Sequence, residues 1–433
     1  MIASKPHPSK LYVETTTLCN LNCEMCVKYA DGACIREQSM SMDVFRALAP
    51  AFPHLDGLIL NGIGEPLLAP HLLEMISLAR QTMRPDALIS FQSNGMLLTP
   101  ALAEDLVRAG LDKICLSVDM VGREGVFHGG EDISDTVHAF EYLQDAARKV
   151  GRPLSIGVEF VLMRDNAEAL PRSLEWAADQ GADFGLVTHM LPYAEDMADQ
   201  ELFNPNTDRS MLEFERWRQE AEDLGMNLSA YFGTSWKFRK TNEDLRLMRF
   251  VNERRMEAFS RDIPIHIVSL EEWSTPDKLA EQQWLEALLA EARSVAEARG
   301  MDVALPPVAA THERKCDFME QGVVHITPTG DARPCYFLWH EYSCFMDKGL
   351  KKVSPVTFGN VTEDSILDIW NSEDYVAFRT EALRYDFPYC SNCSVVPCSD
   401  VTGAMGVFQQ DCYGLNIPCG HCHWCMGGLR CLL

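Results

Sequence analysis

The 433-residue sequence lacks the features that would place a protein in or across a membrane. It has no run of about 18 apolar residues, so no transmembrane helix is expected. The first residues, MIASKPHPSK, contain no apolar stretch of the kind that a secretory signal needs. Basic residues are also scarce, because 38 Lys and Arg stand against 63 Asp and Glu for a formal net charge of −25. Such a charge repels phosphate backbones and anionic lipid alike, so we expect a cytoplasmic protein with no nucleic-acid or membrane partner.

Cysteine, in contrast, is abundant and clustered. Of the 16 cysteines, eleven lie from Cys316 onward, and only Cys34 and Cys115 lie between Cys26 and Cys316. Because the cytoplasmic thiol pool keeps cysteines reduced, metal ligation explains this number better than disulfides do.

Residues 10–193 alternate short apolar runs with longer amphipathic stretches, the pattern of repeated β/α units. Strands are expected at 10–14, 57–61, 87–92, 113–118, 155–162 and 184–188, and helices at 70–82, 100–110, 135–150 and 170–181. Six such units predict an α/β fold, a partial (β/α)6 TIM-type barrel.

The remainder of the chain changes character twice. Residues 201–305 are rich in charged helical sequence around one apparent strand at 263–269, and 306–433 are dominated by Cys, Gly and Pro. A chain of this length also exceeds what a single core usually supports. We therefore divide it into a barrel (1–200), a helical insertion (201–305) and a C-terminal cysteine-rich module (306–433).

The first cysteine cluster has the spacing C-x3-C-x2-C and follows the first expected strand directly. It consists of Cys19, Cys23 and Cys26. A [4Fe-4S] cubane usually takes four cysteines, so three thiolates leave one iron open for another ligand. The alternative, a structural zinc site, normally needs a fourth ligand, and only Cys34 lies nearby.

With this loop after its first strand, the region 10–200 resembles the radical S-adenosylmethionine (radical SAM) superfamily. The resemblance implies that the open iron binds the amino and carboxylate groups of SAM. It also places the backbone of Met25 against the adenine, at a position where the family usually has an aromatic residue.

Further family motifs follow in order at successive strand ends, where parallel barrels bind their ligands. Gly62, Gly64 and Glu65 are similar to the GGE motif beside the SAM amino group, Ser93 and Asn94 to the T-N-G turn, and Ser117 and Asp119 to the S-x-D near the ribose. After the fifth and sixth strands, Arg164 and His189 are further candidates for binding SAM. Arg164 is suited to neutralising the SAM carboxylate as a bidentate partner.

The C-terminal module resembles the SPASM extension of radical SAM enzymes, with a cysteine, then G-x4-C, then a later C-x2-C pair. Its spacing departs from the SPASM pattern after Cys393, and a second cysteine run follows. The candidate ligands are Cys316, Cys335, Cys390, Cys393, Cys398, Cys412, Cys419, Cys422, Cys425 and Cys431. The resemblance implies two auxiliary [4Fe-4S] clusters, without assigning every ligand. A zinc ribbon built from two of the C-x2-C pairs is the alternative. Cys34, Cys115 and Cys344 are expected to be buried apolar residues.

The resemblance also implies a function. Radical SAM enzymes cleave SAM reductively to a 5′-deoxyadenosyl radical, which abstracts hydrogen from a substrate. SPASM members modify peptides or proteins, and the terminal text DCYGLNIPCGHCHWC is similar to maturases of metalloenzymes such as tungsten-cofactor oxidoreductases. We therefore expect an oxidoreductase or maturase that acts on a peptide or protein and takes electrons from a flavodoxin or ferredoxin. The alternatives are a small-molecule dehydrogenase or epimerase, and a non-catalytic iron–sulfur electron carrier.

Overall fold

The computed structural model describes residues 5–30, 32–122, 125–346, 349–393 and 410–432. The candidate ligand Cys398 therefore lies outside the described residues. No helix in the described ranges is both long enough and apolar enough to cross a bilayer.

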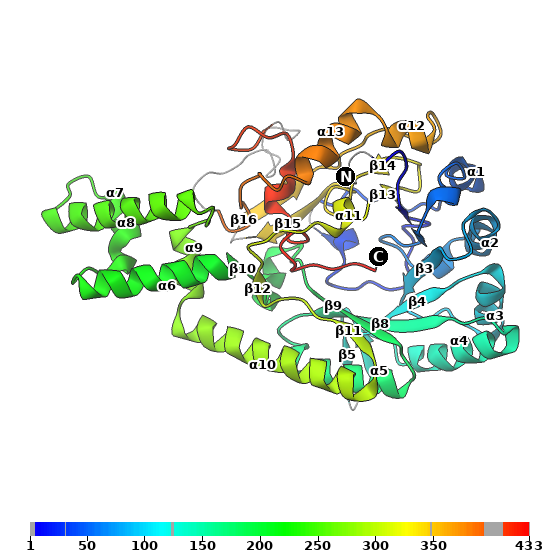
Figure 1. Ribbon diagram of the computed structural model, residues 1–433. Coiled ribbons are helices and arrows are strands. Elements are labelled where there is room, and N and C mark those ends of the chain that lie inside the picture. The colour runs from blue at the N-terminus through cyan, green and yellow to red at the C-terminus, as the bar shows by residue number, and fades with distance from the viewer. Residues whose placement is uncertain (1–4, 31, 123–124, 347–348, 394–409, 433) are drawn as a thin grey trace.

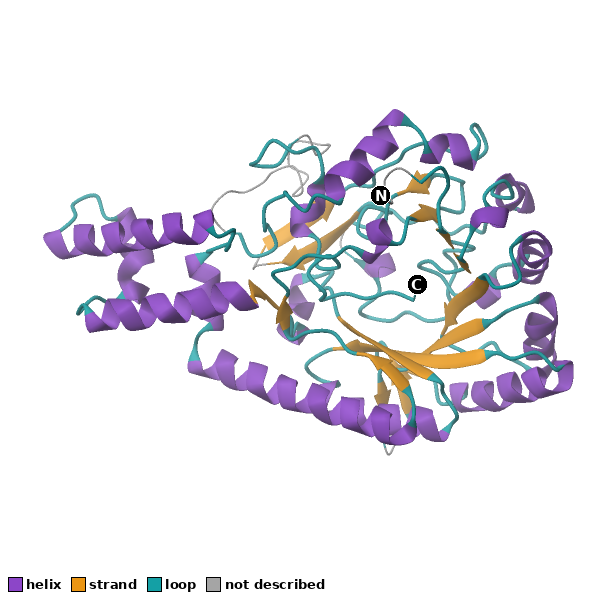
Figure 2. Cartoon of the chain, viewed as in Figure 1, coloured by secondary structure: helices purple, strands orange, loops and turns teal. Residues whose placement is uncertain are grey.

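A nine-stranded sheet forms the centre of the protein (Figures 1 and 2), in the order β11-β9-β8-β4-β3-β2-β1-β13-β14. Its strands are β1 (Lys10–Val13), β2 (Gly57–Ile59), β3 (Leu88–Ser93), β4 (Lys113–Ser117), β8 (Ser155–Leu162), β9 (Phe184–His189), β11 (Asp302–Ala304), β13 (Val323–Ile326) and β14 (Ala332–Arg333). All neighbouring strands are parallel except β13 and β14. The six expected strands lie next to one another in chain order, which confirms the α/β partial barrel.

The sheet also extends beyond the six expected units. β13 pairs with β1 and β11 pairs with β9, so segments expected outside the barrel complete both of its edges. The division of the chain at 200 and 305 stays a prediction, and these two pairings show that the three parts share one sheet.

Helices cover the outer face of the sheet (Figure 1). They are α1 (Met42–Ala47), α2 (Leu72–Thr82), α3 (Pro100–Ala109), α4 (Thr136–Val150), α5 (Leu170–Asp179) and α10 (Pro276–Arg299). The helix α3 shows how the sequence sets the ends of these helices. The Thr99 hydroxyl accepts a hydrogen bond from Leu102 N–H at its start, and Pro100 occupies its first turn. Gly110 ends the helix with φ 113°. The largest apolar core lies between these helices and the sheet.

Alternate residues of the strands face the barrel interior. On β1, Leu11 and Val13 belong to the outer core, whereas Tyr12 belongs to a second core shared with the C-terminal module. The chain end also lies inside the barrel, where Leu432 packs with Cys115 of β4 and Leu186 of β9 (Figure 1). The interior is thus filled by the module and by its tail.

Four helices form an arm that projects from the barrel (Figure 1). They are α6 (Asp208–Asp223), α7 (Tyr231–Trp236), α8 (Asn242–Ser260) and α9 (Ile267–Trp273), and they share a separate apolar core around Trp217. The strand expected at 263–269 is wrong, because the chain turns into α9 at Ile267. The alternating Ile263, Ile265 and Ile267 imitate a strand, but Ile267 and Leu270 are spaced for a helix whose buried face joins the arm core.

Smaller elements complete the fold. They are β5 (Met120–Val121), β6 (Val126–His128), β7 (Glu131–Asp132), β10 (Asn204–Thr207), β12 (Ala309–Ala310), β15 (Tyr342–Met346), β16 (Gly349–Val353), α11 (Asp317–Glu320), α12 (Ile366–Trp370) and α13 (Glu373–Ala382). The β5–β7 sheet matters for the site, because its end packs against the first cysteine cluster.

Candidate functional site

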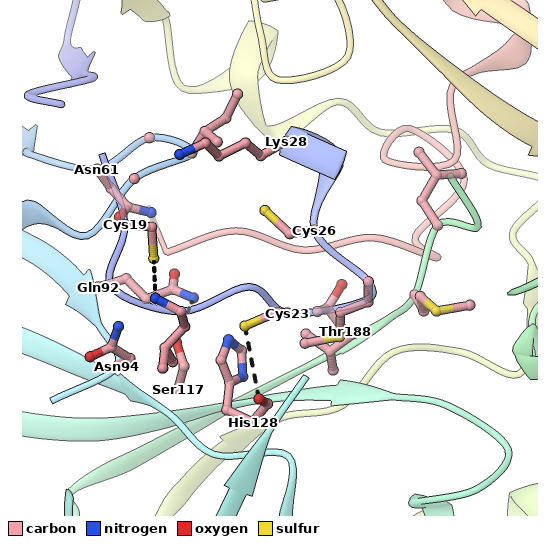
Figure 3. Close-up of a pocket in the computed structure, with 18 of the residues that line it drawn as sticks. Cys19, Cys23, Cys26, Lys28, Asn61, Gln92, Asn94, Ser117, His128 and Thr188 are labelled. Carbon is pink, nitrogen blue, oxygen red and sulfur yellow. Dashed lines mark hydrogen bonds between the residues drawn. The ribbon is translucent and has the colours of Figure 1, made fainter. Parts of the chain in front are cut away.

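A cavity of about 270 Å³ lies at the carboxyl ends of the barrel strands (Figure 3). The predicted residues that line it are Cys19, Cys23, Met25, Cys26, Gly62, Gly64, Glu65, Ser93, Asn94, Ser117 and His189. The structure thus brings together eleven predicted residues from the ends of four strands, β2, β3, β4 and β9, and from the loop after β1. This is the location expected for a ligand site in a parallel barrel.

The three cysteines of the first cluster lie around this cavity (Figure 3). Their loop is held by backbone contacts, among them Cys26 N–H to Cys23 O at 3.0 Å and Glu65 N–H to Leu18 O at 2.7 Å. Burial raises the pKa of the Cys19 thiol and raises that of Cys26 to about 11, and the neighbouring cysteines contribute in the same direction. Thiols in such surroundings ionise when a metal supplies positive charge, so this donor set fits an iron–sulfur cluster.

Gly62 and Gly64 allow the loop after β2 to pack against the cysteine loop. A Cβ at Gly64 would lie 2.4 Å from Leu18 O, and a Cβ at Gly62 would lie 2.3 Å from Glu14 Cγ. Gly129, at the end of the β5–β7 sheet, likewise allows that sheet to pack against the cysteine loop, because a Cβ at this position would lie 2.3 Å from Cys23 Cβ. The sequence had not singled out Gly129. Gly64 and Gly129 thus allow close approach to the cysteine loop, and Gly62 allows close approach to Glu14 directly after β1.

Glu65 joins the ends of β2 and β3. Its carboxylate accepts from Ser93 Oγ and Asn94 N, both at 2.8 Å, and from Leu67 N at 3.0 Å. The Asn94 side chain in turn donates to Asn20 in the cysteine loop at 2.9 Å. Burial raises the pKa of Glu65, against the effect of these hydrogen bonds. The predicted motif residues therefore form one connected network beside the tripod of thiols.

Asp119 lies outside this cavity. Its carboxylate accepts from Gly129 N and Val161 N, both at 2.8 Å, and pairs with His128 at 2.7 Å. Although burial opposes the charged form of His128, Asp119 raises the pKa of this histidine well above its usual range. Asp119 lines a neighbouring cavity of about 1300 Å³, which it shares with Met25. It supports the site through His128 and the backbone and does not line the main cavity, whereas Ser117 of the same motif does. A contact of Asp119 with SAM stays a prediction.

Arg164 also lies away from the main cavity. Its guanidinium forms an ion pair with Glu281 of α10 and donates to Asp199 O, and it lies outside the main cavity. The sequence gave no sign that α10 would fold back to supply this partner, and the role of Arg164 toward the SAM carboxylate stays a prediction.

The C-terminal tail supplies cavity residues that the sequence had not singled out. Trp424, Leu429 and Arg430 line the same space as the tripod. They lie about 400 residues after the tripod cysteines, in a segment whose sequence has no helical or strand periodicity. Their only sequence signal was their position between predicted cysteine ligands.

The cysteines of the C-terminal module fall into two groups. The first group contains Cys316, Cys335, Cys419, Cys422 and Cys425. In it, Cys425 Sγ lies 3.1 Å from Cys422 O and 3.8 Å from Cys419 O. Burial raises the pKa of the Cys335 thiol, and the nearby Cys422 and Cys316 add to this effect. The second group, Cys390, Cys393 and Cys412, lines a cavity of about 450 Å³ at the base of the arm.

Cys431 stands apart from both groups. It accepts from Trp424 Nε1 at 3.2 Å inside the barrel. Of the three cysteines expected to be buried apolar residues, Cys115 and Cys344 are buried, whereas Cys34 is exposed.

Comparison with known proteins adds to this geometry. Residues 13–177 match the family model of the radical SAM superfamily, and residues 316–394 match that of SPASM, an iron–sulfur cluster-binding domain. The chain is 26% identical over 423 residues to the tungsten-containing aldehyde ferredoxin oxidoreductase cofactor-modifying protein of Pyrococcus furiosus, covering 96% of this chain and 94% of that protein.

Two further similarities are more limited. A PqqA peptide cyclase of Gluconobacter oxydans is 28% identical over 242 residues, which are 52% of this chain and 61% of that protein. The crystal structure of Streptococcus suis SuiB bound to S-adenosylmethionine superposes with a TM-score of 0.50 at 13% identity, covering 93% of this chain and 73% of that chain. The latter likeness concerns the fold alone.

A radical SAM domain implies a [4Fe-4S] cluster and SAM, and a SPASM domain implies auxiliary iron–sulfur clusters. The tripod lines the main cavity and the module cysteines form two groups, and the assignment of these cysteines as cluster ligands stays a prediction. The chain belongs to the radical SAM superfamily and carries a C-terminal SPASM domain.

Proposed function

We propose that this enzyme is an oxidoreductase-type maturase that abstracts a hydrogen atom from a peptide or protein, in the service of a metalloenzyme. The observation that carries the proposal is the cavity in which three cysteines of C-x3-C-x2-C spacing face a network of strand-end polar groups. When bound there, the cluster and SAM supply one-electron cleavage of the sulfonium and a 5′-deoxyadenosyl radical.

The chain's own residues bind, orient and exclude water. Cys19, Cys23 and Cys26 hold the cluster, and the Glu65 network with Ser93 fixes the loop beside it. Leu429 and other apolar residues line the cavity on the side of the tail, where they limit the access of water to a reactive intermediate.

The size and shape of the neighbouring space support a peptide or protein substrate. A cavity of about 1300 Å³ adjoins the tripod cavity, and Met25 and Tyr29 line both. A segment of peptide can enter through the larger space and present one residue to the smaller one. The similarity to a cofactor-modifying protein over 96% of the chain supports the proposal that the modified product serves a metalloenzyme.

The module cysteines suggest how electrons move. We assign the first group of module cysteines, around Cys422, and the second group, around Cys390, to two auxiliary [4Fe-4S] clusters. The second group borders a cavity at the base of the arm, where an electron donor such as a flavodoxin or ferredoxin can approach. The cytoplasm, with its reduced thiols, suits these ligands.

The experiment is anaerobic reconstitution followed by reduction in the presence of SAM and of candidate substrates encoded by neighbouring genes. We expect deoxyadenosine, and we expect deuterium from a labelled substrate peptide or protein to appear in it, as mass spectrometry would measure. Deoxyadenosine that forms without any transfer of label from such substrates would contradict the maturase proposal.

A further inference from the structure

One wall of the main cavity is built by the C-terminal tail, and the function proposed above gives its polar groups no role. Leu429 and Arg430 line the same cavity as the tripod. Two hydrogen bonds fix the tail against the end of β9: His189 N donates to Gly428 O at 3.1 Å, and Arg430 N donates to Thr188 Oγ1 at 2.9 Å. The tail therefore holds the Arg430 side chain at a set place beside the cavity.

Arg430 differs from the other charged side chains of this cavity. Lys28 is paired with Glu37 at 2.8 Å, and Glu65 accepts three hydrogen bonds. Within the part of the chain that the structure describes, Arg430 forms no ion pair, and its Nε is buried without a hydrogen-bond partner. The side chain as a whole is partly exposed, but a buried donor without a partner costs free energy, so Arg430 is suited to an anion that comes from outside the chain.

His189 supplies a second unused group next to Arg430. It is 2% exposed, and its Nε2 lies 2.9 Å from Pro307 O, a carbonyl that only accepts. Nε2 therefore carries the ring proton. Burial lowers the pKa of His189 to about 4, so the ring is neutral at pH 7. Its Nδ1, which is buried and has no partner, is then a free hydrogen-bond acceptor.

We propose that Arg430 and His189 bind the molecule that the enzyme modifies. Arg430 pairs with an anionic oxygen of that molecule, and His189 Nδ1 accepts from an adjacent O–H or N–H. The inference rests on the proposed function, because it names the anchor for the substrate of that same site. A peptide offers this pair of groups as a side-chain carboxylate beside an amide N–H, and a phosphorylated small molecule offers it as a phosphate beside a hydroxyl.

The position in the sheet separates this anchor from the Glu65 network, although the sequence also named His189 as a candidate for binding SAM. Glu65, Ser93 and Asn94 follow β2 and β3, whereas His189 ends β9, and β4 and β8 lie between them. The anchor thus lies across the cavity from the Glu65 network.

The test is calorimetric titration of the anaerobic holoenzyme, saturated with SAM, with glutarate in one arm and inorganic phosphate in the other. We expect one equivalent of anion to bind, and we expect Arg430→Gln to weaken binding about tenfold or more, as for loss of a charge-assisted hydrogen bond. Tighter binding of glutarate identifies a carboxylate group, and tighter binding of phosphate identifies a phosphoryl group. Arg108→Gln is the matched control, because that arginine pairs with Glu104 on α3 and does not line the cavity.

Two outcomes would overturn the inference. One is equal anion affinity in Arg430→Gln and the wild type. The other is a tenfold loss of SAM affinity in the variant, measured without added anion, because Arg430 would then serve SAM.

The wild type provides a second readout that needs no folded variant. Glutarate or phosphate should protect Arg430 from phenylglyoxal, as peptide mass spectrometry would detect, and unchanged modification would count against the anchor. These measurements need no turnover. Wild-type enzyme that binds the anion but releases no deoxyadenosine refutes the proposed function alone, and the converse result refutes the anchor alone.

Discussion

Replacing Gly64 with alanine perturbs the packing that holds the cysteine loop. A Cβ at this position would lie 2.4 Å from Leu18 O, 2.5 Å from Thr16 O and 2.7 Å from Thr17 C. All three atoms belong to the backbone that leads into Cys19, so they cannot rotate away as the tip of a side chain would. The shortest of these distances must lengthen from 2.4 Å to at least 3.4 Å before the contact is ordinary. Overpacking of this kind costs about 1–3 kcal/mol.

We therefore expect Gly64→Ala to lower the free energy of unfolding by about 1–3 kcal/mol in denaturant titrations. Because the loop carries the tripod, we also expect the iron content to fall. Deoxyadenosine formation should drop about 100-fold, as for a displacement near 1 Å.

The matched control is Gly233→Ala in α7, where a Cβ meets nothing within 4 Å. That change should leave the iron content unaltered and stabilise the helix by about 0.5–1 kcal/mol. A Gly64→Ala protein with wild-type stability, iron and activity would refute the packing argument.

Three other predictions concern protonation, the arm and the clusters. Burial raises the pKa of Glu159 from 4.5 to about 8, so the folded state keeps a proton that the unfolded state releases, and stability falls as pH rises through this range. Glu159→Gln should remove that part of the slope in denaturant unfolding at several pH values, and an unchanged slope would contradict the burial argument. Trp217→Ala, in the separate arm core, should lower the free energy of unfolding of the arm by about 3–5 kcal/mol. It should speed amide exchange in α6 to α9 only and leave the iron content unchanged. Faster exchange in the barrel as well would show that the arm is not an independent unit. Iron analysis should give about 12 iron atoms per wild-type chain and about eight after Cys19, Cys23 and Cys26 are replaced by alanine, and equal contents would exclude the tripod as a cluster site.

Local patterns in the sequence predicted the barrel and the first cluster. The six strands are short apolar runs bounded by turns, and the C-x3-C-x2-C spacing fixes three thiols within one loop, so neither needs knowledge of distant contacts. The strand-end residues Glu65, Ser93 and Asn94 follow from the same logic, because parallel strands bring their carboxyl ends to one edge.

Contacts between distant segments limited the rest of the prediction. The pairing of Arg164 could not be predicted because its partner, Glu281, lies on a helix more than 100 residues further along. Arg430 was missed because nothing near it in sequence indicates that the tail enters the barrel. The false strand before α9 arose because alternating isoleucines fit both a strand and an irregular entry to a helix.

The most direct test of the account is substrate-free cleavage of SAM by the reduced, anaerobically reconstituted protein. The wild type and a Cys34→Ala control, which changes an exposed thiol, should release deoxyadenosine and methionine in equal amounts. The protein in which alanine replaces all three tripod cysteines should release neither. Deoxyadenosine from that triple variant at the wild-type rate would contradict the claim that these three thiols hold the iron that binds SAM.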